Sequence, residues 1–205
     1  MNALETLLRR VITLFDELHQ PWALVGGLAV SVRTEPRFTR DLDLAVAVSG
    51  DSAAEGLVHQ LHGAGFHTFA TVEHETKKRL ATARLSLGKT NHEGLVLDLL
   101  FASSGIEKEI CHAAESLTVF PELAIPVASI HHLMILKVLS RDDRTRPQDA
   151  ADLRQLIAAA RPSDLASACE AGRIITQRGF NRDRDLSQKM KATWLEFRDG
   201  QAEGN

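Results

Sequence analysis

Hydrophobic residues recur every three or four positions over residues 2–19, which is the spacing of one face of an α-helix. Pro21 ends that predicted helix, because proline cannot continue the backbone hydrogen bonding. A short apolar strand follows at 22–25, and the Gly-Gly pair at 26–27 predicts a turn into a short helix over 28–33. Residues 41–48 then alternate, with large apolar side chains at every second position. This alternation predicts a strand with one buried face.

Between residues 51 and 128 the pattern switches repeatedly between helical and strand spacing. It predicts helices over 51–63 and 106–114, and strands near 66–70, 80–87, 95–101 and 122–127. A Gly/Lys/Thr/Asn turn joins the strands at 80–87 and 95–101 into a predicted hairpin. From residue 129 onward the pattern is helical, over 129–140, 147–160, 162–176 and 182–197. We therefore expect an α+β fold, with a mixed β-sheet flanked by helices in residues 1–128 and a C-terminal helical bundle in residues 129–205.

Composition narrows the class of protein. Of 205 residues, 44% are hydrophobic and 25% are charged, which is ordinary for a globular chain and argues against disorder. The formal net charge of −3 gives no overall attraction to nucleic acid. We expect a cytoplasmic protein without membrane contact, because no signal peptide or apolar span is present. Cys111 and Cys169 lack metal-ligand spacing and are interpreted as reduced thiols.

Three acids stand where an apolar strand would disfavour them. Asp41 and Asp43 begin the alternating strand and project from the same face, so their like charges repel unless something compensates. Asp98 interrupts the otherwise apolar segment 95–101, and a buried carboxylate without a partner is costly. If the two strands are neighbours, three carboxylates converge on one point. Such a set suits one or two Mg²⁺ ions, so these acids are the candidate metal ligands and catalytic residues.

Residues around the acids suit phosphate binding. Gly26 and Gly27 allow close backbone approach at a helix start, where free N–H groups attract phosphate, although a simple tight turn is the alternative. Arg37 and Thr39 alternate with Asp41 and are expected to project toward the same side. They are candidates for contact with phosphate or acid, against a surface arginine and an ordinary strand residue.

These motifs together resemble the polymerase-β-type nucleotidyltransferase superfamily. The resemblance covers roughly residues 22–157 and is closest to the AbiEii/MenT group of nucleotidyltransferase toxins. In addition to the glycines, the Arg-x-Thr-x-Asp-x-Asp segment and Asp98, it includes a helix with Lys137 before a helix with Asp149 and Asp152. The resemblance implies that Lys137 contacts the nucleoside triphosphate and that Asp149 or Asp152 orients Lys137 or the nucleotide.

The function that this resemblance implies is transfer of a nucleoside monophosphate from an NTP to an acceptor hydroxyl. The implied acceptor is tRNA, and the implied setting is a toxin–antitoxin module with a cognate antitoxin. Two alternatives stay open: an antibiotic-modifying transferase that uses the same site, and a catalytically silent relative that acts as a binding partner.

Two secondary predictions concern side chains near the proposed site. Many members of the superfamily have Gly-Ser where this chain has Gly-Gly, and Ser31, one helical turn later, is a candidate substitute for the missing hydroxyl. A second group of residues is a candidate basic rim toward RNA: Arg141, Arg144, Arg146 and Arg154.

Overall fold

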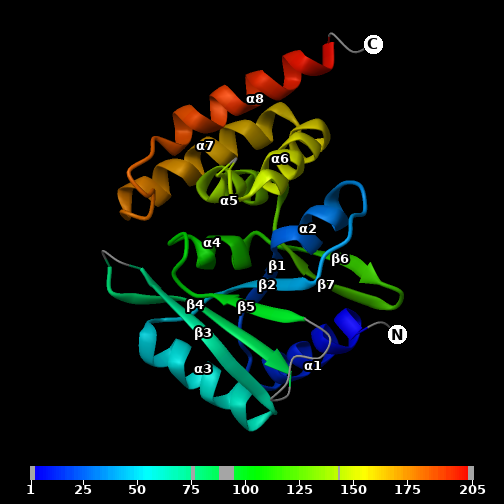
Figure 1. The fold of residues 1–205 in the computed structure, drawn as a ribbon, viewed down its shortest axis with the longest axis vertical. Coiled ribbons are helices and arrows are strands. Elements are labelled where there is room, and N and C mark those ends of the chain that lie inside the picture. Colours follow the sequence, from blue (N-terminus) through cyan, green and yellow to red (C-terminus); the bar gives the residue numbers. More distant parts are fainter. Residues whose placement is uncertain (1–2, 75–76, 88–94, 143, 203–205) are drawn as a thin grey trace.

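The core of the protein is one seven-stranded β-sheet, seen in a computed structural model that describes residues 3–74, 77–87, 95–142 and 144–202 (Figure 1). The strands are β1 (Trp22–Val25), β2 (Asp41–Val46), β3 (Phe66–His74), β4 (Arg79–Leu87), β5 (Val96–Leu100), β6 (Glu115–Phe120) and β7 (Leu123–Val127). Their order in the sheet is β3–β4–β5–β2–β1–β7–β6. Strand β2 is antiparallel to β1 and parallel to β5, so the sheet is mixed, as predicted.

Helices cover both faces of this sheet. The helices are α1 (Ala3–Glu17), α2 (Gly26–Arg33), α3 (Asp51–Gly63), α4 (Glu107–His112), α5 (Ile130–Ser140), α6 (Pro147–Ala159), α7 (Pro162–Gln177) and α8 (Leu186–Ala202). Figure 1 shows α1 and α3 on one face and α2 and α4 on the other, with α5–α8 packed together beyond α2 and α4. The predicted α+β class and the C-terminal helical bundle are confirmed. The division at residue 128 stays a prediction.

Alternation in β2 fixes which side chains reach the functional face. Leu42, Leu44 and Val46 are fully buried, and burying each large apolar side chain contributes about 1.5–3 kcal/mol. A slip of the register by one residue would exchange these side chains for Asp41 and Asp43 in the core. The apolar face of β2 therefore holds both carboxylates on the opposite face.

Two details differ from the sequence prediction. Strand β6 was not predicted, because its side chains are mostly exposed or half-buried at the end of the sheet and give no strong alternation. The last helix begins at Leu186 instead of residue 182, since Arg182 and Asp183 have φ angles of 52° and 55°, which interrupt a right-handed helix. Strands β4 and β5 are antiparallel neighbours, and the turn predicted between them lies outside the described residues.

No helix in the described ranges combines the length and the apolar character needed to cross a membrane.

Candidate active site

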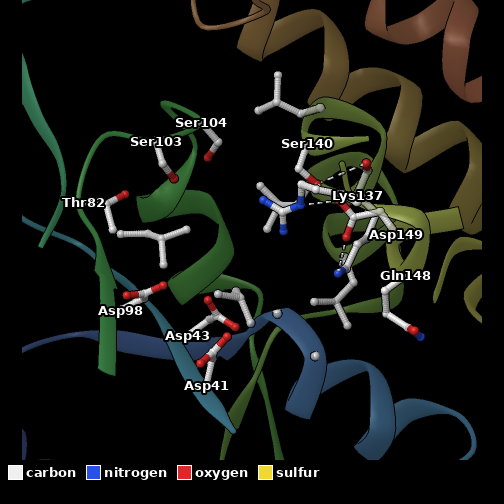
Figure 2. A pocket seen from close by; sticks show the side chains of 18 of the residues that line it. Asp41, Asp43, Thr82, Asp98, Ser103, Ser104, Lys137, Ser140, Gln148 and Asp149 are labelled. Atoms are coloured by element: carbon white, nitrogen blue, oxygen red, sulfur yellow. Dashed lines mark hydrogen bonds and ion pairs between the residues drawn. The ribbon is translucent and has the colours of Figure 1, made fainter. Parts of the chain in front are cut away.

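The two acidic strands are neighbours, and this places their carboxylates side by side. In the parallel pairing of β2 and β5, Asp43 stands directly opposite Asp98. Strand β4 adds Arg84 opposite Asp98 on the other side. Figure 2 shows Asp41, Asp43 and Asp98 together on the sheet side of a cavity. Strands β2 and β5 are therefore neighbours, which is what the predicted convergence of the three carboxylates required.

Gly26 makes room for Asp43. Its φ angle of 67° is in the left-handed region, and an added Cβ would lie 1.9 Å from Asp43 Oδ2. The glycine begins α2 directly after β1, so the start of this helix lies against the carboxylate. A side chain at position 26 is therefore incompatible with the observed position of Asp43.

The opposite wall of the cavity is cationic and comes from α5 and α6. Lys137 is buried, and its Nζ lies 2.7 Å from Asp149 Oδ1 and 2.8 Å from Asp152 Oδ2. Asp149 also accepts hydrogen bonds from Ser140 Oγ at 2.8 Å and pairs with Arg146 at 2.9 Å. These contacts fix the Lys137 side chain, which lies with Ser140 and Asp149 across the cavity from the carboxylates (Figure 2).

Arg37 connects the loop before β2 to α6. Its Nε and Nη2 each donate a hydrogen bond of 2.8 Å to Asp152, whose side chain is fully buried. Gly27 lets the guanidinium approach, since an added Cβ would lie 2.5 Å from Arg37 Nη2. Arg37 is therefore linked through Asp152 to Lys137, and this two-pronged pair occupies two of its donor groups.

The cavity between these walls has a volume of about 690 Å³. Nine of the ten residues selected from the sequence as site residues line it. Those that line it are Gly26, Gly27, Arg37, Thr39, Asp41, Asp43, Asp98, Lys137 and Asp149. Asp152 does not line it and instead holds Lys137 and Arg37 from behind. The cavity is wide enough for a small ligand and carries negative charge on one wall and positive charge on the other.

Charge on the sheet side is not balanced. Burial, followed by the negative charges of Asp98 and Asp41, raises the pKa of Asp43 from 3.8 to about 6, against the weaker opposing effect of the cations across the cavity. Burial also raises the pKa of Asp98, although Arg84 Nε donates to its Oδ1 at 2.8 Å and favours the ionised form. Among the described residues, none donates a side-chain hydrogen bond to Asp41 or Asp43. Additional positive charge at this point would therefore be favourable.

On the cationic side, hydrogen bonds compensate the negative charge of Asp152. Burial alone would raise the pKa of Asp152, but the hydrogen bonds from Arg37 and Lys137 outweigh it and lower the pKa. The two walls therefore differ. The charge of Asp152 is compensated by hydrogen bonds, whereas the charges of Asp41 and Asp43 are not.

A divalent cation fits the donor set of the sheet side only together with further ligands. No three His, Cys, Asp or Glu side chains in the described part of the chain are arranged to hold a metal ion by themselves. Mg²⁺, however, is usually held by one or two carboxylates together with substrate phosphates and water. Asp41 and Asp43, to which no described residue donates a side-chain hydrogen bond, fit that role, whereas Asp98 is already held by Arg84.

Two predictions about neighbouring side chains have different outcomes: Ser31 is not placed for its predicted role, and the basic rim toward RNA stays a prediction. Ser31 does not replace the missing hydroxyl, because its Oγ donates to the Gly27 carbonyl and accepts from the Arg37 backbone N–H outside the cavity lining. The arginine rim is divided: Arg146 lines the cavity, but Arg141 and Arg154 stack on Phe197 of α8.

The sequence did not single out several lining residues. Arg84 could have been suspected, since an arginine inside the apolar segment 80–87 needs an acidic partner, and Asp98 needs a basic one. The remaining side chains in this group are polar residues with no signal of their own: Thr82, Ser103, Ser104, Ser140, Gln148 and Arg182.

Solved structures with the same fold define the class of protein. An antigenic nucleotidyltransferase-like protein from Paracoccidioides brasiliensis matches with a TM-score of 0.58 at 18% identity, over 98% of this chain and 90% of that one. The antibiotic-resistance factor ANT(2'')-Ia, solved in complex with adenylyl-2''-tobramycin, matches with a TM-score of 0.53 at 17% identity, over 98% and 99% of the two chains. The fold is therefore that of a nucleotidyltransferase. No curated protein is significantly similar in sequence.

The particular family follows from the sequence over nearly its whole length. A family model described as nucleotidyl transferase AbiEii toxin, type IV toxin–antitoxin system, matches residues 6–204. The chain belongs to this AbiEii family. It is a nucleotidyltransferase toxin of a type IV toxin–antitoxin system, which implies an NTP substrate and an antitoxin.

Proposed function

We propose that this chain transfers a nucleoside monophosphate from an NTP to a hydroxyl group of RNA, with tRNA as the expected acceptor and Mg²⁺ as the cofactor. The observation that carries the proposal is the arrangement of Asp43 and Asp98 at one level of adjacent strands, facing Lys137 across the cavity. The unbalanced carboxylates favour a bound cation, and the cationic wall favours phosphate. Both are parts of a nucleoside triphosphate bound with its metal.

Each wall has a separate task in this reaction. Asp41 and Asp43 would hold Mg²⁺, which when bound supplies positive charge to the phosphates during transfer. The Lys137 ammonium and the Arg146 guanidinium line the cavity and are placed to bind phosphate oxygens. The N–H groups at the start of α2, beside Gly26, offer further donors to the triphosphate.

Asp98 is the candidate base. It would accept the proton of the acceptor hydroxyl while that oxygen bonds to the α-phosphorus and the bond to pyrophosphate breaks. Arg84 holds its carboxylate at 2.8 Å and keeps one oxygen atom oriented. Positioning and charge stabilisation account for most of the catalysis that such a site can supply.

The decisive experiment incubates the full-length protein and MgCl₂ with each α-labelled NTP and either total RNA or an aminoglycoside. We expect label in an RNA band of tRNA size, and loss of labelling when EDTA removes the metal. Asp43→Asn should lower labelling by about 100-fold or more, by analogy with removal of one charge-stabilising group from an active site. Asp51→Asn is the matched control. Asp51, the first residue of α3, pairs with Arg79 of β4, and neither residue lines the cavity.

Other outcomes overturn the proposal in different ways. Label on the aminoglycoside and none on RNA would make the chain an antibiotic-modifying enzyme. No transfer with any NTP, together with no Mg²⁺-dependent nucleotide binding by calorimetry, would make it a silent family member.

A further inference from the structure

The loop between α7 and α8, residues 178–185, crosses from the C-terminal helices to the catalytic half of the protein (Figure 1). Arg178 Nη2 donates to Glu109 Oε1 of α4 at 2.6 Å. At the other end of the loop, Arg184 Nη1 donates to the carbonyl groups of Leu139 and Arg141, both at 3.1 Å. The loop is therefore held at both ends by hydrogen bonds to different elements.

Phe180 anchors the middle of this loop against the end of β3 and the segment around Gly105. The side chain is buried, and its ring lies 4.6 Å from the His74 ring at the end of β3. Gly105 accommodates the ring, because it has a φ angle of 73° and an added Cβ would lie 2.4 Å from Phe180 Cδ2. Phe180 thus fixes the loop beside the segment that carries Ser103 and Ser104.

Arg182 extends from this anchored loop into the cavity. It is one of the residues that line the cavity, in the company of Ser103, Ser104, Lys137 and Arg146. The other arginines of the loop are used to hold it in place, but no described residue accepts a hydrogen bond or forms an ion pair with the Arg182 guanidinium. Burial, followed by the nearby positive charges of Arg184 and Arg146, lowers its pKa.

The backbone around Arg182 is strained. Arg182 and Asp183 both adopt left-handed conformations, with φ angles of 52° and 55°, which are uncommon for residues other than glycine. Two such residues in succession persist only because their surroundings hold them, and strain of this kind is concentrated at functional sites. The anchored loop thus presents to the cavity a guanidinium that no described side chain pairs with, and a bound anion would neutralise its charge.

Position within the cavity distinguishes the two phosphate sources in the reaction. The triphosphate is served by α2, Lys137 and Arg146, whereas Arg182 lines the cavity from the loop whose Phe180 packs on Gly105. Gly105 directly follows Ser103 and Ser104, which lie on the side of the cavity away from α2 (Figure 2). We infer that Arg182 binds a backbone phosphate of the RNA acceptor and so positions the acceptor, not the NTP. This inference rests on the proposed function, since it requires an RNA acceptor.

The test compares Arg182→Gln with the wild-type protein in the labelling reaction, at varied RNA and varied NTP concentrations. We expect a roughly tenfold higher KM for RNA, corresponding to about 1.4 kcal/mol, and an unchanged KM for the NTP. The dependence of log kcat/KM on log salt concentration should become shallower by about one, because one phosphate contact is lost. Arg182→Lys should retain most of the salt dependence, since it keeps the charge.

Arg173→Gln is the matched control, because Arg173 is an exposed α7 residue paired with Glu170 and does not line the cavity. It removes the same charge and should leave both KM values unchanged. An unchanged KM for RNA in Arg182→Gln, or an equal rise in the KM for the NTP, would refute the inference. A thermal melt of each variant verifies folding.

A second measurement separates failure of this inference from failure of the proposed function. If the wild-type protein labels no RNA, direct RNA binding is measured by fluorescence anisotropy with the wild-type protein and Arg182→Gln. Weaker binding by the variant would support the phosphate contact even then. Equal binding, or no RNA binding by either protein, would overturn it.

Discussion

Replacing Gly26 with alanine tests whether the position of Asp43 matters for catalysis. The added Cβ would lie 1.9 Å from Asp43 Oδ2, whereas real Cβ atoms essentially never approach within 3.0 Å. The carboxylate must therefore retreat by about 1 Å, and a misplacement of that size can lower a rate by about 100-fold. The left-handed conformation of residue 26 adds a cost of about 1–2 kcal/mol to the folded state.

We expect Gly26→Ala to lower kcat for label transfer by about 100-fold and to reduce the free energy of unfolding by about 1–2 kcal/mol. Labelling assays and urea unfolding measure the two effects separately. Gly56→Ala is the control, because nothing lies within 4 Å of its added Cβ in α3. That variant should keep full activity and gain about 0.5–1 kcal/mol of stability. A folded Gly26→Ala protein with wild-type kcat would refute this account of Asp43.

Three further predictions concern the charged groups of the site. Asp152→Asn should lower the free energy of unfolding by about 3–5 kcal/mol in urea titrations, because it removes the fully buried carboxylate that the half-buried Arg37 and the buried Lys137 share, and leaves Lys137 with Asp149 alone. A loss below about 1 kcal/mol would contradict the described pairing. The pKa of Asp43 is raised from 3.8 to about 6, so the folded protein binds its proton more tightly and loses stability as pH rises through that window. Asp43→Asn should abolish this loss and exceed the wild-type stability by about 3 kcal/mol at pH 7, with little difference at pH 4, which urea unfolding at both pH values would verify or exclude. MgCl₂ should raise the melting temperature of the wild-type protein more than that of Asp43→Asn, and equal shifts would argue against a cation at this carboxylate.

Local patterns predicted the parts of the site that one element determines alone. The alternation in β2 places Asp41 and Asp43 on the same face, because a register slip would bury both charges in the core. The isolated Asp98 in an apolar segment indicated a site for the same reason. Their meeting depends on the parallel pairing of β2 with β5, two strands separated by two further strands in the chain, which no local pattern determines.

Contacts between distant segments could not be predicted either, because they also depend on tertiary packing that no local pattern determines. The sequence suggested that Arg37 contacts phosphate or an acid, but it could not show that the acid is Asp152, 115 residues further along. Arg182 was placed at the start of the predicted helix 182–197, whereas the observed helix begins at Leu186. Its left-handed backbone is maintained by the contacts of Phe180 and Arg184, which depend on tertiary packing.

The pairing of Arg37 with Asp152 has a consequence during synthesis of the chain. The carboxylates of β2 and β5 emerge from the ribosome well before Lys137, Asp149 and Asp152, which complete the cavity. A nascent chain that stops before α6 therefore has Arg37 and Lys137 but lacks Asp149 and Asp152, the carboxylates that hold both side chains in place. For a toxin made inside the cell that it can harm, translation products that end before α6 are therefore expected to be inactive.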